Sequence, residues 1–223
     1  MGIIHLMIWI TGVAVYMGFS KALTEGTPLS LQGASPLLWG LQSIAAGTSV
    51  AGLTLFLFWR AQGWRFPAYA GEYLLATFGL FYVCSLLMPL AYWLIVATSG
   101  ELPGSPWDSV WMRLYCALLY SASGVLLIVG AMLSRPARWR FILIYFGALL
   151  LANAMSVMAH GLQWFTILHA ASVIFTLSLL VVCVMDLVQR VRYPWTHWLG
   201  PAVCLWSGVI QIVVLVRMTI VRA

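Results

Sequence analysis

Residues 141–185 read FILIYFGALLLANAMSVMAHGLQWFTILHAASVIFTLSLLVVCVM and divide at His160 and Gly161 into two apolar runs. Neither run contains Asp, Glu, Lys or Arg. A helix that crosses a membrane needs about 20 predominantly apolar residues, and each run is close to that length. Glycine at the junction favours a tight turn. The stretch therefore predicts two antiparallel membrane-spanning helices joined by a short hairpin.

The composition of the whole chain extends this prediction beyond the hairpin. Of the 223 residues, 63% are hydrophobic and 7% are charged, whereas soluble domains carry about 25% charged residues. Nearly every segment lies in an apolar run of spanning length or in a short polar gap between two such runs. We therefore expect an all-helical integral membrane protein in which residues 1–223 form a single transmembrane domain surrounded by the lipid bilayer.

Apolar runs separated by gaps that contain Gly, Pro and Arg predict a bundle of seven transmembrane helices. The expected helices cover residues 3–23, 36–59, 70–98, 109–133, 139–160, 163–188 and 195–221. The second of these helices is rich in Gly, Ala and Ser. Small residues allow neighbouring helices to approach closely in lipid. We therefore expect the second helix at the centre of the bundle.

The distribution of arginine predicts how the bundle is oriented, because short cytoplasmic gaps retain Lys and Arg. The gaps after the second, fourth and sixth expected helices contain Arg60, Arg65, Arg135, Arg138, Arg140, Arg190 and Arg192. The N-terminus is therefore expected in the cytoplasm of a bacterial inner membrane or its equivalent, and the C-terminus outside. Arg217 and Arg222, near the C-terminus, oppose this orientation.

Polar side chains recur at spacings of three and four residues on both helices of the hairpin, so each helix presents a polar stripe. The two stripes and the turn between them contain Asn153, Ser156, His160, Gln163, Thr166, His169, Ser172 and Thr176. Polar groups within a membrane are costly unless they are paired. The stripes therefore predict a seam that either binds a ligand or solute, or holds the helices together through interhelical hydrogen bonds.

The four histidines are candidate axial ligands of haem b, because histidines on different helices can bind the iron from opposite faces. His160 and His169 form one candidate pair, although His169 would lie deeper than His160 by about a turn and a half of helix. His5 and His197, both near cytoplasmic helix ends, form the other pair. No other cofactor is expected. No metal site is expected either, because the four cysteines lie far apart in sequence.

Acidic side chains are expected only near helix ends. Glu72 and Asp186 lie near cytoplasmic ends beside Arg65 and Arg190, where interfacial ion pairs are expected. Without an acid at mid-membrane, the sequence does not favour a proton-driven pump. Basic residues are spread over short gaps and form no basic domain, which argues against nucleic-acid binding.

No catalytic motif surrounds the polar seam, so an enzymatic role is not expected. The composition favours a non-catalytic, multi-pass membrane component that packs with partner proteins, lipids or pigments, or with further copies of itself. Two alternatives stay open. One is a b-type haem electron-transfer subunit that uses the histidine pairs. The other is a small-solute transporter or channel that uses the seam between the fifth and sixth helices.

Overall fold

The computed structural model describes residues 3–24, 36–63, 68–99, 110–134, 136–159 and 162–222. This part of the chain is all-helical. Its helices are α1 (Ile3–Thr24), α2 (Pro36–Ala61), α3 (Ala70–Ser99), α4 (Val110–Leu133), α5 (Ala137–Met158), α6 (Leu162–Val188) and α7 (Trp195–Arg222). The predicted helices are confirmed with small shifts at their ends. For example, α5 begins directly after Pro136, whose backbone is extended, because proline favours the start of a helix and not its interior.

Four helical stretches are long and apolar enough to cross a membrane. They are Ser43–Ala61, Val110–Leu133, Ala137–Met158 and Ile167–Val188. A fifth apolar stretch, Trp9–Gly18, is shorter. Large apolar side chains on the outer faces of α4, α5 and α6 are exposed, as expected for surfaces that face lipid tails. These four candidate spans, counted over the described residues, indicate a lipid environment.

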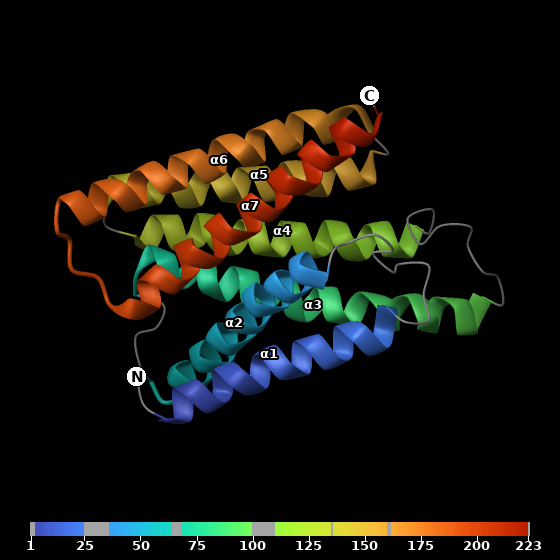
Figure 1. The fold of residues 1–223 in the computed structure, drawn as a ribbon, viewed down its shortest axis with the longest axis horizontal. Helices are drawn as coiled ribbons and strands as arrows, with labels where there is room; N and C mark the ends of the chain where they lie inside the picture. Colours follow the sequence, from blue (N-terminus) through green and yellow to red (C-terminus); the bar gives the residue numbers. More distant parts are fainter. Residues whose placement is uncertain are drawn as a thin grey trace.

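The seven helices pack with α1 and α2 on one side, α5 and α6 on the other, and α3, α4 and α7 between them (Figure 1). The central helix is α3, which packs against α1, α2, α4, α5 and α7. The expectation that the second helix lies at the centre was therefore wrong. The small residues of α2 instead permit close contacts with two of its neighbours: Gly47 lies against Val13 of α1, and Gly52 against Leu75 of α3.

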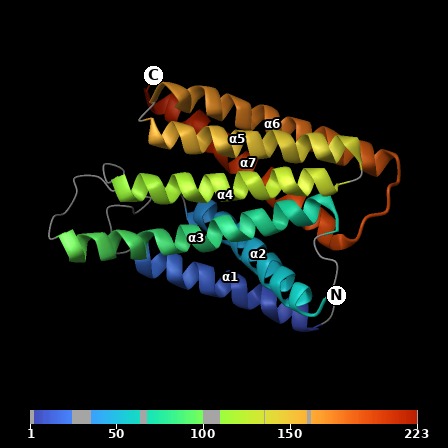
Figure 2. The same ribbon diagram turned by 180° about the vertical axis from the view of Figure 1, so that it is seen from behind.

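Successive helices run in opposite directions, so α1 begins and α7 ends at opposite ends of the bundle (Figures 1 and 2). One end collects the starts of α3, α5 and α7 and the ends of α2, α4 and α6. The described arginines at this end are Arg60, Arg138, Arg140, Arg190 and Arg192. We call it the arginine-rich end.

Two glycines allow α3 and α7 to cross in backbone contact near the arginine-rich end. A Cβ atom at Gly71 would lie 1.8 Å from the carbonyl oxygen of His197, and one at Gly200 would lie 1.8 Å from the carbonyl oxygen of Gly71. The Gly71 N–H also donates a hydrogen bond to Nδ1 of His197 at 3.1 Å. Pro201 lies inside α7, and because proline has no N–H, it cannot bond the His197 carbonyl. That carbonyl instead faces α3.

Gly200→Ala is expected to destabilise the protein by about 1–3 kcal/mol, because the added methyl group would displace the α3 backbone. The measurement is the thermal unfolding midpoint of the purified protein in detergent. Gly18→Ala on α1 is the matched control, since a Cβ there meets nothing within 4 Å and alanine favours a helix more than glycine does. Equal midpoints for the two variants would contradict the crossing.

Candidate functional site

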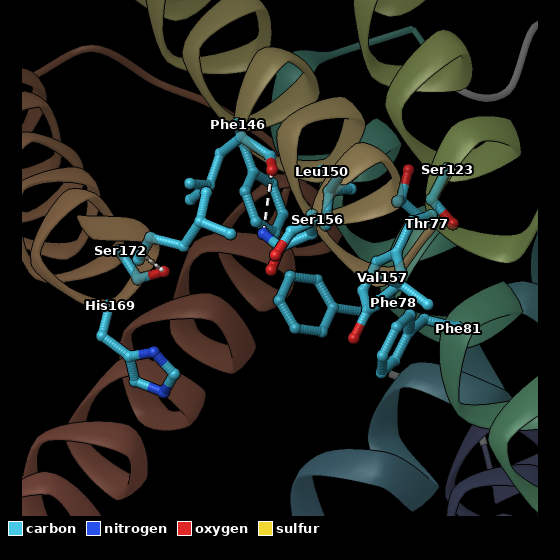
Figure 3. Close-up of a pocket in the computed structure, with 14 residues that line it drawn as sticks. Thr77, Phe78, Phe81, Ser123, Phe146, Leu150, Ser156, Val157, His169 and Ser172 are labelled. Carbon is cyan, nitrogen blue, oxygen red and sulfur yellow. Dashed lines mark hydrogen bonds between the residues drawn. The ribbon is translucent and has the colours of Figure 1, made fainter. Parts of the chain in front are cut away.

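A cavity of about 460 Å³ lies between α3, α4, α5 and α6 (Figure 3). Its aromatic wall comes from three helices and consists of Phe78, Phe81, Tyr120 and Phe146. The polar lining consists of Thr77, Ser123, Asn153, Ser156, His169 and Ser172. Leu149, Leu150, Val157 and Leu168 complete the described lining. Cavities of this size that combine an apolar wall with a few polar groups are typical of small-molecule sites.

The structure brings together four of the residues that the sequence predicted for the seam. Asn153 and Ser156 of α5 and His169 and Ser172 of α6 line the same cavity. Thr176 does not line it and packs instead against Gly208 of α7, where a glycine Cβ would lie 2.4 Å from the Thr176 Oγ1. His160 lies outside the described residues, as do the side chains of Gln163 and Thr166.

The hydrogen bonds of the cavity lining run mainly within single helices. Asn153 donates to the Leu149 carbonyl at 2.8 Å, and Ser172 donates to the Leu168 carbonyl at 2.9 Å. The α5–α6 pair is instead joined by Tyr145, whose hydroxyl donates to the Ala171 carbonyl at 2.9 Å. These bonds from Asn153 and Ser172 to their own helices therefore do not cross from α5 to α6.

Spacing along the sequence did not identify the α3 and α4 part of this site. Thr77, Phe78 and Phe81 come from α3, and Tyr120 and Ser123 from α4. Ser123 and Thr77 lie on one side of the cavity, and His169 and Ser172 on the other (Figure 3). Polar stripes report which residues share a helix face, but they do not report which helices face one another. The sequence therefore contained no signal for the part of the lining that comes from α3 and α4.

A second polar cluster occupies the arginine-rich end. Asp186 of α6 is fully buried, forms an ion pair with Arg138 of α5, and accepts a hydrogen bond from Trp139 Nε1 at 2.7 Å. Arg138 also donates to the Gln189 side chain. The expected pair of Asp186 with Arg190 was therefore wrong. Arg190 follows α6 with a backbone φ of 52° and is exposed, whereas Arg138 lies in the first turn of α5.

Glu72 joins the start of α3 to the start of α7. One carboxylate oxygen accepts the backbone N–H groups of Ala68 and Tyr69 at 2.8 and 3.2 Å, and the other accepts the Thr196 hydroxyl. These bonds satisfy N–H groups at the helix start, where a negative charge is also favourable. Glu72 is thus a helix-capping and helix-linking residue. Arg65, its expected partner, lies outside the described residues.

His197 lies in an aromatic cage at the same end. Its ring stacks on Tyr193 at 4.0 Å between centroids and meets the Trp139 ring edge-on at 4.6 Å. Burial and the Asp186 carboxylate raise the pKa of the Tyr193 phenol, which keeps it neutral. Because Nδ1 accepts the Gly71 N–H, the proton of a neutral ring lies on the buried Nε2, so iron could bind this ring only if the hydrogen bond to Gly71 were broken.

The described part of α1 includes the backbone of His5, but its side chain lies outside the described residues, so the His5–His197 haem pair stays a prediction. The pair of His160 with His169 also stays a prediction. Among the described residues, no group of three or more His, Cys, Asp or Glu side chains could hold a metal ion. The four cysteines form no disulfide.

No protein-family model, no curated protein and no solved structure matches the chain. A functional assignment therefore depends on the geometry of the two polar sites. The side chains of the cluster at the arginine-rich end contact one another, whereas the cavity between α3, α4, α5 and α6, called the α3–α6 cavity from here on, has space for another molecule.

Arg138→Met is expected to destabilise the protein by about 3–5 kcal/mol, because the buried Asp186 carboxylate loses its counter-charge. The double variant Arg138→Met/Asp186→Leu should recover most of this loss, since it removes both charges. Arg190→Met is the control and should leave the protein unchanged. Thermal unfolding of all three variants provides the comparison, and an Arg190→Met variant as unstable as Arg138→Met would contradict the assigned ion pair.

Proposed function

We propose that the chain is a seven-span membrane protein that binds a small solute in the α3–α6 cavity, as a transporter or channel does. The observation that carries this proposal is the cavity itself, which gathers polar side chains from α3, α4, α5 and α6 around an aromatic wall. Polar groups inside a membrane domain are costly, so they indicate a function where they line a space. The role is non-catalytic.

Helix length supports seven spans. The helices α1, α3 and α7 contain 22, 30 and 28 residues. Even the shortest of them is about 33 Å long, which exceeds the thickness of about 30 Å of the hydrocarbon core. With the arginine-rich end in the cytoplasm, the N-terminus lies inside and the C-terminus outside. Arg217 and Arg222 then lie near the outer end of α7.

The cavity lies away from the arginine-rich end. Between them, the bundle is filled by Leu74, Ile142, Leu143 and Leu179, all fully buried. Asn153 and Ser156 lie near the end of α5, and His169 near the start of α6. We therefore infer that the cavity is closed toward the cytoplasm and is reached from the outside.

The cavity favours solute binding over the two other roles that the sequence left open. A subunit role requires a surface that distinguishes a protein partner from lipid, and the exposed apolar side chains of α4, α5 and α6 suit lipid equally well. An electron-transfer role requires a histidine pair on one iron, and the buried His197 ring already uses one nitrogen to hold α3.

Fusions to reporter proteins test the orientation. Alkaline phosphatase fused after Ala223 should be active, because the enzyme requires the oxidising exterior, whereas green fluorescent protein fused there should be dark. Fusions after Gly63 and Gln189, both at the arginine-rich end, should give the opposite pattern. A fluorescent fusion after Ala223 would show that the C-terminus is cytoplasmic and would contradict the proposed topology, either because the bundle is inverted or because the number of spans is even.

Thiol labelling tests the cavity. Ser156→Cys places a thiol on the cavity wall, and Val125→Cys places one on the outer face of α4, where the valine side chain is 53% exposed. A membrane-impermeant maleimide added to intact cells should label Ser156→Cys, because a thiol in a water-filled cavity can ionise. A thiol surrounded by lipid stays protonated, so Val125→Cys should remain at the level of the wild type.

The wild type sets the background of this experiment because it carries four native cysteines, of which Cys116, Cys183 and Cys204 are buried. Failure of Ser156→Cys to label above this background, with normal amounts of protein in the membrane, would contradict an outward-opening solute cavity.

A further inference from the structure

The lining of the cavity indicates a ligand without net charge. None of the described residues that line it is Asp, Glu, Lys or Arg, and its titratable side chains are those of His169 and Tyr120. An ion inside the membrane domain would therefore meet no permanent counter-charge, and burying an unpaired charge is far more costly than burying a neutral polar group. Carboxylates, phosphates and ammonium compounds do not suit this space.

The aromatic wall indicates a flat ligand. The rings of Phe78 and Phe146 are stacked, with centroids 5.6 Å apart and an angle of 22° between their planes. Phe81 and Tyr120 form a second pair with centroids 5.6 Å apart. Aromatic rings favour offset stacking and edge-to-face contacts with other rings. A planar, largely apolar molecule would make more of these contacts than a flexible chain.

Ser123 supplies the polar contact that such a ligand would use. Most described Ser and Thr side chains in these helices donate to the carbonyl four residues earlier, as Ser49 and Ser134 do at 2.8 Å. Ser123 is fully buried, lines the cavity, and its Oγ has no hydrogen-bond partner. A buried hydroxyl without a partner is costly. Ser123 is an exception to this pattern, which points to a hydrogen-bond partner that is not part of the chain.

We propose that the cavity binds an uncharged, planar, mostly apolar molecule whose hydrogen-bonding group meets the Ser123 hydroxyl. This inference rests on the proposed function, because it names the ligand class of the same cavity. The apolar body of the ligand lies against the aromatic wall, on the sides of the rings that face the cavity. The Ser123 hydroxyl then selects among molecules of similar shape, since a ligand without a polar group at that position leaves the hydroxyl unpaired.

A matched set of bicyclic probes tests the inference. The full-length protein in lipid nanodiscs is dialysed against 1-naphthol, 1-methylnaphthalene or 1-naphthoate, with empty nanodiscs as the reference. We expect 1-naphthol to bind about fivefold more tightly than 1-methylnaphthalene, which is the effect of one hydrogen bond. We expect 1-naphthoate not to bind above the reference, because its carboxylate is charged.

Three variants assign the binding to this site. Ser123→Ala should retain binding of 1-methylnaphthalene and lose the preference for 1-naphthol. Ser121→Ala, two residues away on α4 and half-buried, should behave as the wild type. Ser156→Trp should reduce binding of both uncharged probes, because the indole fills the cavity.

Each departure from this pattern overturns the inference. A preference for 1-naphthol that survives in Ser123→Ala removes the role of Ser123, and strong binding of 1-naphthoate removes the restriction to uncharged ligands. Failure of both uncharged probes to bind the wild type overturns the ligand class. Labelling of Ser156→Cys involves no ligand, so that experiment decides separately whether the proposed function also fails.

Discussion

Backbone contact between α3 and α7 at Gly71 and Gly200 determines how the other helices are arranged. The crossing allows the Gly71 N–H to reach His197, and it brings Glu72 to Thr196. Once α7 lies against α3, the His197 ring contacts Trp139 of α5, and Trp139 in turn bonds Asp186 of α6. Four helices are thereby joined through a chain of polar and aromatic contacts that starts at two residues without side chains.

The two ends of the bundle consequently differ in character. At the arginine-rich end, Asp186 pairs with Arg138, Glu72 accepts the Thr196 hydroxyl, and His197 accepts the Gly71 N–H, so side-chain bonds join α5 to α6 and α3 to α7. Farther from that end, Asn153 and Ser172 bond to their own helices, and a cavity lies between α3, α4, α5 and α6. A bundle that is closed by specific bonds at one end and hollow near the other has the asymmetry that binding from one side of a membrane requires.

The sequence predicted the helices well because the apolar runs and the gaps between them are local features. Helical spacing also placed Asn153 beside Ser156 and His169 beside Ser172, which line one cavity, whereas Thr176 of the same predicted stripe packs against α7. Partners across helices were not predictable in the same way. Asp186 was expected to pair with Arg190, which lies close to it in sequence. In the structure, α5 begins directly after Pro136, whose backbone is extended, and this start places Arg138 within reach of Asp186. Ser123 stands out only because its hydroxyl lacks the bond that most similar residues make, and a sequence does not show hydrogen bonds.

The α3–α7 crossing also has a consequence for synthesis of the chain. The partners of Gly71 and Glu72 lie 126 and 124 residues later in the sequence. At translation rates of about 5–20 residues per second, the ribosome needs about 6–25 s to add that many residues. During this interval α3 has left the ribosome, but α7, which will cover the Glu72 carboxylate and the backbone at Gly71, has not yet been made. The central helix of the bundle is thus completed last, and a nascent chain that stops before α7 exposes this face to the membrane insertion machinery and to proteases.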